Sequence, residues 1–201
     1  MTSSQLSRSQ PSHAPLSPFE SLWTRLKEVD PAGVHQDEAL CIMSLTAQYH
    51  WSPPVVLEIG TGHGVSAILM NMGGAHVVTF ESDESKLRSA QKNARDFAAK
   101  NLIFIPGKSP EAVQGVSPDV RKKINMAFID GDHSYESVLE DLREAVMLVP
   151  LAGWVMGLGY GREPGVTQAV DEIASTGQMS NPILFTPRQA DNSLFLSSLR
   201  V

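Results

Sequence analysis

The sequence predicts an α/β fold built on a doubly wound, mostly parallel sheet of seven strands. Five short runs that are apolar on both faces alternate with amphipathic segments, and they lie at 55–59, 76–80, 102–105, 124–129 and 153–157. Runs of this kind suit parallel strands that helices cover on both sides, and the alternation indicates successive βαβ units. Two further strand-like pieces, 182–186 and 193–199, follow each other across a short loop. We therefore expect a C-terminal antiparallel hairpin at the edge of the sheet.

Amphipathic segments between these runs predict the helices. Helical spacing of apolar residues favours helices at 65–72, 84–99, 110–116, 135–149 and 166–174. The residues that mark the buried faces of the second and fourth of these helices are Leu87, Ala90, Ala94, Phe97, Leu139, Leu142, Val146 and Val149.

The chain divides into an N-terminal arm and one domain. Residues 1–18 are rich in Ser, Pro and Gln and lack the apolar centre of a secretory signal, so we expect a disordered arm. Residues 19–201 then form a single domain. Two helical patterns predict a cap over 19–52, and Pro53-Pro54 ends helix formation, so the Rossmann-like core covers 53–201.

Composition limits the classes of partner. The formal net charge is −6, which disfavours a grip on nucleic acid backbones. Cys41 is the single cysteine, so no internal disulfide can form, and a reducing cytoplasm is expected. No apolar run approaches the roughly 18 residues of a membrane span, so we expect no membrane partner.

A glycine-rich loop follows the first strand. The stretch VVLEIGTGHGVSAIL places Gly60, Gly62 and Gly64 at the junction of strand and helix, where glycine lets the backbone turn sharply and approach a ligand. A dinucleotide fingerprint would need glycine at position 65, where the chain has Val65. The loop is therefore either a tight turn or a site for another nucleoside.

Two carboxylates favour the nucleoside site. Glu58 lies inside the first strand, where a carboxylate is costly unless it makes hydrogen bonds. Glu81 ends the second strand about 20 residues after the first glycine, the spacing at which an acidic side chain can bind ribose hydroxyls. The alternative for Glu81 is a surface residue before a helix that Asp83 caps.

These residues resemble a known family. E-x-G-x-G-x-G after the first strand, an acidic residue that closes the second and the terminal hairpin are similar to the class I S-adenosylmethionine-dependent methyltransferases, over about 54–201. The stretch FIDGDHSYESVLEDL, followed by a strand and PGVTQAVDEI, resembles the small-molecule O-methyltransferase-like branch, in which I-D-G-D-H-S-Y recurs after the fourth strand.

The resemblance implies S-adenosyl-L-methionine as the cofactor. Glu58 and the loop glycines would shape the methionine pocket, Glu81 would hold the ribose, and 107–109 would lie beside the adenine. The cofactor-binding residues expected from it are Glu58, Gly60, Thr61, Gly62, Gly64, Glu81, Ser82, Gly107, Lys108, Ser109 and Asp130.

Asp130, His133 and Tyr160 are the candidate catalytic residues. Asp130 ends the fourth strand, and ligands of parallel sheets bind at the carboxyl ends of the strands. His133 is either a general base or a polar loop residue. Tyr160 and Arg162 could bind an anionic acceptor, or they are ordinary loop residues.

The turn between Asp130 and the following helix also carries Asp132 and Ser134. Either side chain can cap that helix, and we favour Asp132 for the cap. His63, inside the glycine loop, is expected to line the site as a neutral residue.

We expect no metal ligands. Metal-dependent relatives often carry G-H-D-Y after the fifth strand, where this chain has Gly157-Leu158-Gly159-Tyr160. Asp130 and Asp132 alone could hold Mg²⁺ only with many waters.

The leading hypothesis is a methyltransferase that acts on a small molecule at oxygen without an obligatory metal, with a possible homodimer. One rival is a methyltransferase-like protein that binds the nucleoside without methyl transfer, since Leu158-Gly159 replace His-Asp. The other is a nicotinamide-dependent oxidoreductase.

Overall fold

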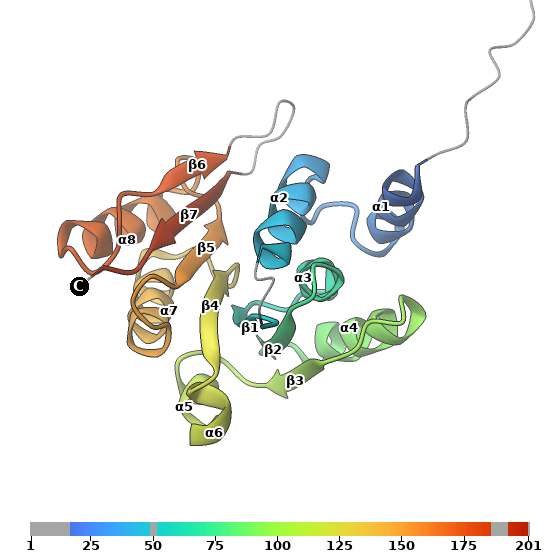
Figure 1. Ribbon diagram of the computed structural model, residues 1–201, viewed down its shortest axis with the longest axis horizontal. Coiled ribbons are helices and arrows are strands. Elements are labelled where there is room, and N and C mark those ends of the chain that lie inside the picture. The colour runs from blue at the N-terminus through green and yellow to red at the C-terminus, as the bar shows by residue number, and fades with distance from the viewer. Residues whose placement is uncertain (1–16, 49–51, 186–192, 201) are drawn as a thin grey trace, which may run out of the picture.

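The protein is described by a computed structural model over residues 17–48, 52–185 and 193–200 (Figure 1). One sheet of seven strands runs through the molecule in the order β3-β2-β1-β4-β5-β7-β6. Its strands are β1 (Val55–Ile59), β2 (His76–Glu81), β3 (Leu102–Pro106), β4 (Ile124–Ile129), β5 (Trp154–Leu158), β6 (Ile183–Phe185) and β7 (Leu194–Ser198). The first five pair in parallel, and β7 is antiparallel to both β5 and β6. The predicted fold class and the C-terminal hairpin are confirmed.

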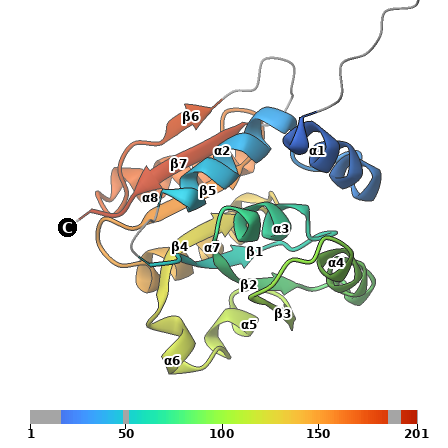
Figure 2. The same cartoon turned by 45° about the vertical axis from the view of Figure 1, so that its right-hand side comes forward.

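Helices cover both faces of this sheet, as the two views show (Figure 1 and Figure 2). The helices are α1 (Pro18–Val29), α2 (Gln36–Ala47), α3 (Val65–Met72), α4 (Glu84–Asp96), α5 (Glu111–Gln114), α6 (Pro118–Arg121), α7 (Tyr135–Leu148) and α8 (Pro164–Ser175). One apolar core joins α5, α7 and α8 to the sheet, and a second joins α1, α2 and α3 to its other face. The sheet is thus doubly wound, as predicted.

Element boundaries differ from the predicted ones by small amounts. β5 begins one residue later than expected, and α4 ends at Asp96 because Phe97 and Ala98 leave the helix, Ala98 with a positive φ. The four-residue helix α6 was not predicted. On α7 the buried face includes Asp141 and Glu144, whereas Val146 is half-buried.

The N-terminal cap has local signals that fix its helices. Ser17 accepts a hydrogen bond from the Glu20 amide, and the Glu20 carboxylate accepts one from the Ser17 amide, which forms a capping box. α1 therefore begins at Pro18, at the last position of the predicted arm. Residues 1–16 of that arm and the loop 186–192 of the hairpin lie outside the described residues. Among the described helices, none is long and apolar enough to cross a membrane.

The topology positions a site where β1 and β4 lie side by side. The chain leaves β1 toward β2 and β3 on one side, and reaches β4 and β5 on the other. This reversal is the switch point at which open parallel sheets bind ligands, beyond the carboxyl ends of the strands. The glycine loop and Asp130 follow β1 and β4 at this point.

Glu58 is an acidic residue whose side chain is buried in the core of the sheet. It has no exposed surface, and its Oε1 accepts a hydrogen bond from Ser66 Oγ at 2.5 Å. Within the described residues its Oε2 has no hydrogen-bond partner. Burial raises its pKa from 4.5 to about 8, against the opposing effect of Ser66 and Thr79. The folded chain therefore holds Glu58 protonated at neutral pH.

Replacing Glu58 by Gln should flatten part of the dependence of stability on pH. The unfolded carboxyl ionises near 4.5 and the folded one near 8, so its contribution is fully present below the lower value and is lost as pH rises. Relative to Glu58→Gln, we expect the wild-type free energy of unfolding to fall by about 1.4 kcal/mol per pH unit across this window. Urea titrations at several pH values measure it.

The matched control for this prediction is Glu136→Gln, which removes an exposed carboxylate from α7. Its pH profile should run parallel to that of the wild type. Parallel profiles for Glu58→Gln and the wild type would contradict a protonated Glu58.

Candidate functional site

The glycine loop passes directly over the end of β4. Gly60 has φ +94°, and a Cβ on it would lie 2.1 Å from the carbonyl oxygen of Asp130. A side chain cannot be accommodated there. At Gly62 nothing lies within 4 Å of the position of a Cβ, so this part of the loop borders open space. The loop therefore offers bare backbone to a ligand, as the sequence predicts.

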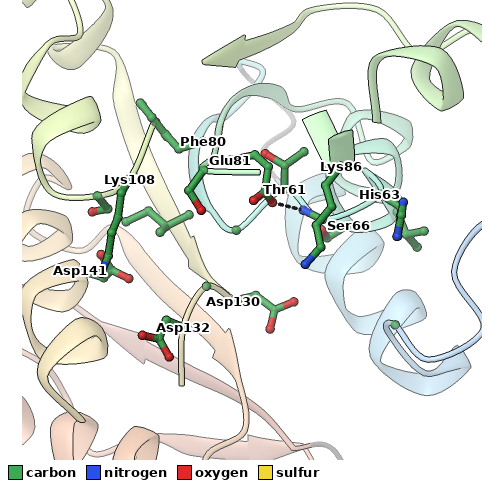
Figure 3. Close-up of a pocket in the computed structure, with 18 of the residues that line it drawn as sticks. Thr61, His63, Ser66, Phe80, Glu81, Lys86, Lys108, Asp130, Asp132 and Asp141 are labelled. Atoms are coloured by element: carbon green, nitrogen blue, oxygen red, sulfur yellow. Dashed lines mark hydrogen bonds between the residues drawn. The ribbon is translucent and has the colours of Figure 1, made fainter. Parts of the chain in front are cut away.

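Glu81 is fixed against this loop from the end of β2. Its Oε2 accepts a hydrogen bond from the Gly62 amide at 2.8 Å (Figure 3). Its Oε1 accepts one from the Asp83 amide at 2.9 Å. Asp83 caps α4 through its own Oδ1, as predicted. A carboxylate oxygen has more than one acceptor site, so Glu81 can still accept hydrogen bonds from a ligand.

A cavity of about 340 Å³ opens above these residues. Its walls come from the loops that follow β1, β2, β3 and β4 and from the linker between α1 and α2. The first turns of α3 and α4 and the first two turns of α7 complete them. Figure 3 shows Glu81 on one side, Asp130 and Asp132 on another, and Lys108 close to Asp141 in this view. The four strand ends that the topology brings together thus form one concave site.

Most of the expected cofactor residues line this cavity, and four expected site residues do not. Those in the wall are Gly60, Thr61, Gly62, Glu81, Ser82, Gly107, Lys108, Ser109 and Asp130. Those outside it are Glu58, Gly64, His133 and Tyr160. Glu58 lies beneath the loop and reaches the wall through Ser66, which does line the cavity. Gly64 instead packs against Ala90 of α4, 3.0 Å from the position of its Cβ.

Asp130 and His133 form a pair at the edge of the cavity. His133 Nε2 lies 3.3 Å from Asp130 Oδ1, and the two side chains are 35% and 25% exposed. Burial raises the pKa of Asp130, and the hydrogen bond with His133 opposes this rise. The same hydrogen bond raises the pKa of His133 above 6.5, against partial burial. The pair can therefore hold and release a proton beside the cavity.

The remaining polar residues of this turn have structural partners. Asp132 Oδ1 accepts from the Ser134 amide, and Asp132 Oδ2 accepts from the hydroxyls of Ser134 and Ser137. Ser134 is the residue at the N-cap of α7, where its side chain makes no capping hydrogen bond. The predicted role of Asp132 is thus changed: it fixes the turn and the first helical residues and does not itself occupy the cap. His63 lines the cavity, with Nδ1 3.1 Å from Ser89 Oγ.

Tyr160 turns away from the cavity. Its hydroxyl donates to Asp171 Oδ1 of α8 at 2.8 Å, and its ring lies against that of Phe195, with centroids 6.1 Å apart. Arg162 Nε lies 3.7 Å from Glu163 Oε1 on the same loop. The structure therefore does not bring Tyr160 to the cofactor side of the site.

Several residues of the wall were not predicted. Ser66, Lys86 and Asp141 line the cavity, as does the linker between α1 and α2 through Asp30 and its neighbours Gly33 and Val34. A signal for Asp141 existed in the sequence, because Ser134, Ser137 and Asp141 recur at helical spacing and form a polar stripe. The sequence of the linker between α1 and α2 shows no comparable pattern that would have placed it in the cavity wall.

Comparison with known proteins identifies the domain. A family model that describes a methyltransferase domain matches residues 57–157, which include the glycine loop, Glu81 and the Asp130 turn. No curated protein sequence matches the chain closely enough to count as a relative.

Three solved structures show the shared fold. The cofactor-bound protein Rv0187 from MTB superposes with a TM-score of 0.75 at 16% identity, covering 92% of this chain and 90% of that one. The O-methyltransferase from Bacillus cereus in complex with SAH gives 0.73 at 17%, covering 92% of each chain. TomG, an O-methyltransferase from Streptomyces achromogenes in complex with SAM, gives 0.70 at 15%, covering 92% and 91%.

The family match spans half of the chain and contains the glycine loop and the carboxylates that first suggested it. The chain therefore belongs to the methyltransferase-domain family, in the class I enzymes that use S-adenosyl-L-methionine as the methyl donor.

Proposed function

We propose that the protein transfers a methyl group to an oxygen of a small-molecule acceptor, without an obligatory metal. The observation that carries this proposal is the cavity at the ends of β1 to β4, which has Glu81 fixed over the glycine loop and the Asp130–His133 pair at its edge. The structural neighbours from Bacillus cereus and Streptomyces achromogenes are both O-methyltransferases, which supports oxygen as the acceptor atom.

The residues of the cavity fit S-adenosyl-L-methionine. Glu81 can accept hydrogen bonds from ribose hydroxyls, and the open space at Gly62 leaves room for a ligand against the backbone. Ser109 lines the cavity with its side chain buried beside Asp141, whose pKa burial raises and the hydrogen bond from Ser109 lowers. When bound, the cofactor supplies a methyl group on a positively charged sulfur. The carboxylate of Asp30 in the wall suits such a cation.

We assign His133 as the general base. When His133 Nε2 donates its hydrogen to Asp130 Oδ1, Nδ1 carries the lone pair that can accept a proton from the acceptor hydroxyl. Asp130 thus fixes the ring and stabilises the imidazolium that forms. The rest of the rate enhancement would come from holding acceptor and donor in line, which needs no further chemical group.

Tyr160 has a positioning role in this proposal. Its phenol holds Asp171, and so connects the loop after β5 to α8. That loop contributes Glu163, whose charge also raises the pKa of His133.

Metal independence rests on the loop after β5. Leu158 and Gly159 offer no oxygen or nitrogen side-chain ligand near Asp130. In the described part of the chain, no cluster of three or more His, Cys, Asp or Glu side chains is arranged to hold a metal ion. The nucleoside-binding rival is not favoured, since transfer by alignment and proton removal needs neither missing residue. A cytoplasmic location and a homodimer stay predictions.

The function is tested by turnover on a panel of hydroxylated small molecules with chelator-treated protein. We expect product with at least one phenol or alcohol, because the proposed machinery consists of protein side chains alone. Formation of labelled product from methyl-labelled cofactor measures it. Tight nucleoside binding without product on any acceptor, or activity that returns only with magnesium, would contradict the proposal.

Glu81→Ala should weaken binding of S-adenosylhomocysteine at least about tenfold, because a hydrogen bond to a charged acceptor contributes roughly 1.5 to 3 kcal/mol. Titration calorimetry gives the dissociation constant. Glu84→Ala is the control, since its carboxylate is exposed at the first position of α4 and pairs with Arg88. An unchanged dissociation constant for Glu81→Ala would refute the ribose assignment.

The pH profile of turnover tests His133. Because the base must be neutral and Asp130 raises its pKa, kcat/KM should rise with pH through a midpoint above 6.5. Asp130→Asn should move that midpoint to lower pH, and His133→Ala should lower kcat by about a hundredfold or more. Identical profiles for wild type and Asp130→Asn would show that His133 is not the titrating base.

A further inference from the structure

Asp30 is a half-buried carboxylate of the cavity wall that takes no part in the proposed proton transfer. It is the C-cap residue of α1, begins the linker to α2, and lines the cavity together with Gly33 and Val34 of the same linker. Its Oδ1 accepts a hydrogen bond from the Ala32 amide at 3.2 Å, and its Oδ2 lies 2.7 Å from the position of a Cβ on Gly33. The carboxylate is therefore held against the linker, where a glycine leaves room for it.

Contacts made by α1 keep this linker over the cavity. Arg25 Nη2 donates to the carbonyl of Asp96 at 3.3 Å, and Arg25 Cζ lies 4.4 Å from the centroid of the Phe97 ring, at the end of α4. Lys27 Nζ donates to the carbonyl of Val34 in the linker at 3.4 Å. The place of the carboxylate in the wall is thus set by the chain itself, before any ligand binds.

The charge of Asp30 acts inside the cavity and has no counter-ion there. Among the ion pairs of the described residues, none includes Asp30. Burial raises the pKa of Asp130 at the end of β4, and the charge of Asp30 raises it further. The two carboxylates therefore act on the same part of the cavity and give it a negative potential. A carboxylate without a counter-ion in a partly enclosed site favours a cationic ligand.

The Asp130–His133 pair marks the end of the cavity at which the methyl group must be transferred. In the proposed reaction the bond between sulfur and methyl breaks with its electron pair left on sulfur, the acceptor oxygen bonds to the methyl carbon, and His133 takes the hydroxyl proton. The sulfur is positively charged before this step and neutral after it. A fixed charge near this end of the cavity therefore distinguishes the methyl donor from its product.

We propose that Asp30 makes the cavity selective for the charged methyl donor over its neutral product, so that transfer of the methyl group loosens the hold of the site on the nucleoside. The inference rests on the proposed function and deepens it, because it assigns product release to the linker between α1 and α2. Since the charge disappears during transfer, the interaction stabilises the bound donor but not the bound product. Its benefit lies in the exchange of product for fresh donor, a step that limits the turnover of many enzymes.

The ammonium group of the methionine part gives the alternative, because donor and product both carry it. A carboxylate that bound this shared group would stabilise donor and product equally. The influence of Asp30 on Asp130 favours the sulfur, since Asp130 lies at the reaction end of the cavity. A ratio of affinities between charged and neutral ligands separates the two roles.

The test compares the dissociation constants of S-adenosylmethionine, sinefungin and S-adenosylhomocysteine by titration calorimetry without an acceptor. Sinefungin carries a protonated amine in place of the methylated sulfur, so two of the ligands are charged at this position and the third is neutral. Asp30→Asn should weaken binding of both charged ligands by about fivefold or more, because water screens a partly exposed charge pair without abolishing it. Binding of S-adenosylhomocysteine should change by less than about twofold, since asparagine keeps an oxygen that can accept from the Ala32 amide.

Asp37→Asn is the matched control. It removes an exposed carboxylate from the first turn of α2, outside the cavity wall, and changes the net charge by the same amount. Its dissociation constants should stay within about twofold of those of the wild type, because solvent screens exposed charges over this range. Asp30→Ser is the second variant should the asparagine protein fail to fold, since a serine hydroxyl can also accept a hydrogen bond in a turn of this kind. Wild-type affinity for S-adenosylhomocysteine shows that a variant is folded.

Loss of affinity for the charged ligands alone, in the Asp30 variants but not in Asp37→Asn, supports selection of the donor by the linker. Equal losses for all ligands would show that Asp30 binds the shared ammonium group, and unchanged constants would show that its charge does not act on the ligand. Either result overturns the inference and leaves the cofactor site standing, because the wild type still binds S-adenosylhomocysteine. Failure of the wild type to bind any of the ligands overturns the proposed function together with the inference.

Discussion

The close approach of the glycine loop to the end of β4 is the constraint on which the site depends. A Cβ on Gly60 would overlap the carbonyl of Asp130, so only glycine lets the chain leave β1 and pass over its neighbour. The Asp130 amide donates to the carbonyl of Ile59, which ends both strands at the same level. Because φ is positive at Gly60, the conformation is one that glycine adopts without strain. The loop and the Asp130 side chain therefore face one cavity.

A polar layer beneath the loop maintains this geometry. Thr61 Oγ1 and Thr79 Oγ1 are 2.5 Å apart, Ser66 donates to Glu58, and Glu81 holds the amides of Gly62 and Asp83. A loop that turns away from its strand leaves backbone amides without ladder partners, and buried amides need acceptors. Glu81 from β2 thus supplies acceptors to the amides of Gly62 and Asp83, while the amides of Gly60 and Thr61 donate to the carbonyl of Phe80. The burial of Glu58 follows from this arrangement, and so does its raised pKa.

The sequence predicted the fold and most of the residues that line the cavity around the glycine loop, because both depend on local patterns. Apolar runs place the strands, and glycines with Glu81 at a fixed spacing place the loop. What could not be predicted depends on how distant elements pack. Tyr160 follows β5 at the carboxyl edge of the sheet, yet its phenol donates to Asp171 of α8. Asp30 enters the wall only because α1 and α2 fold back over the sheet, and no periodicity encodes that contact.

Several carboxylates line the cavity, and their positions decide whether they stabilise the bound methyl donor or the transition state of methyl transfer. Transfer removes the positive charge from sulfur, so a carboxylate fixed against the sulfonium would stabilise the bound cofactor more than the transition state. Asp130 avoids this position in part, because its Oδ1 is directed at His133. Burial also raises the pKa of Asp130 and so weakens its preference for the charged form. In the proposed mechanism the carboxylate would therefore act mainly through the imidazole, where it would stabilise the proton that the acceptor gives up.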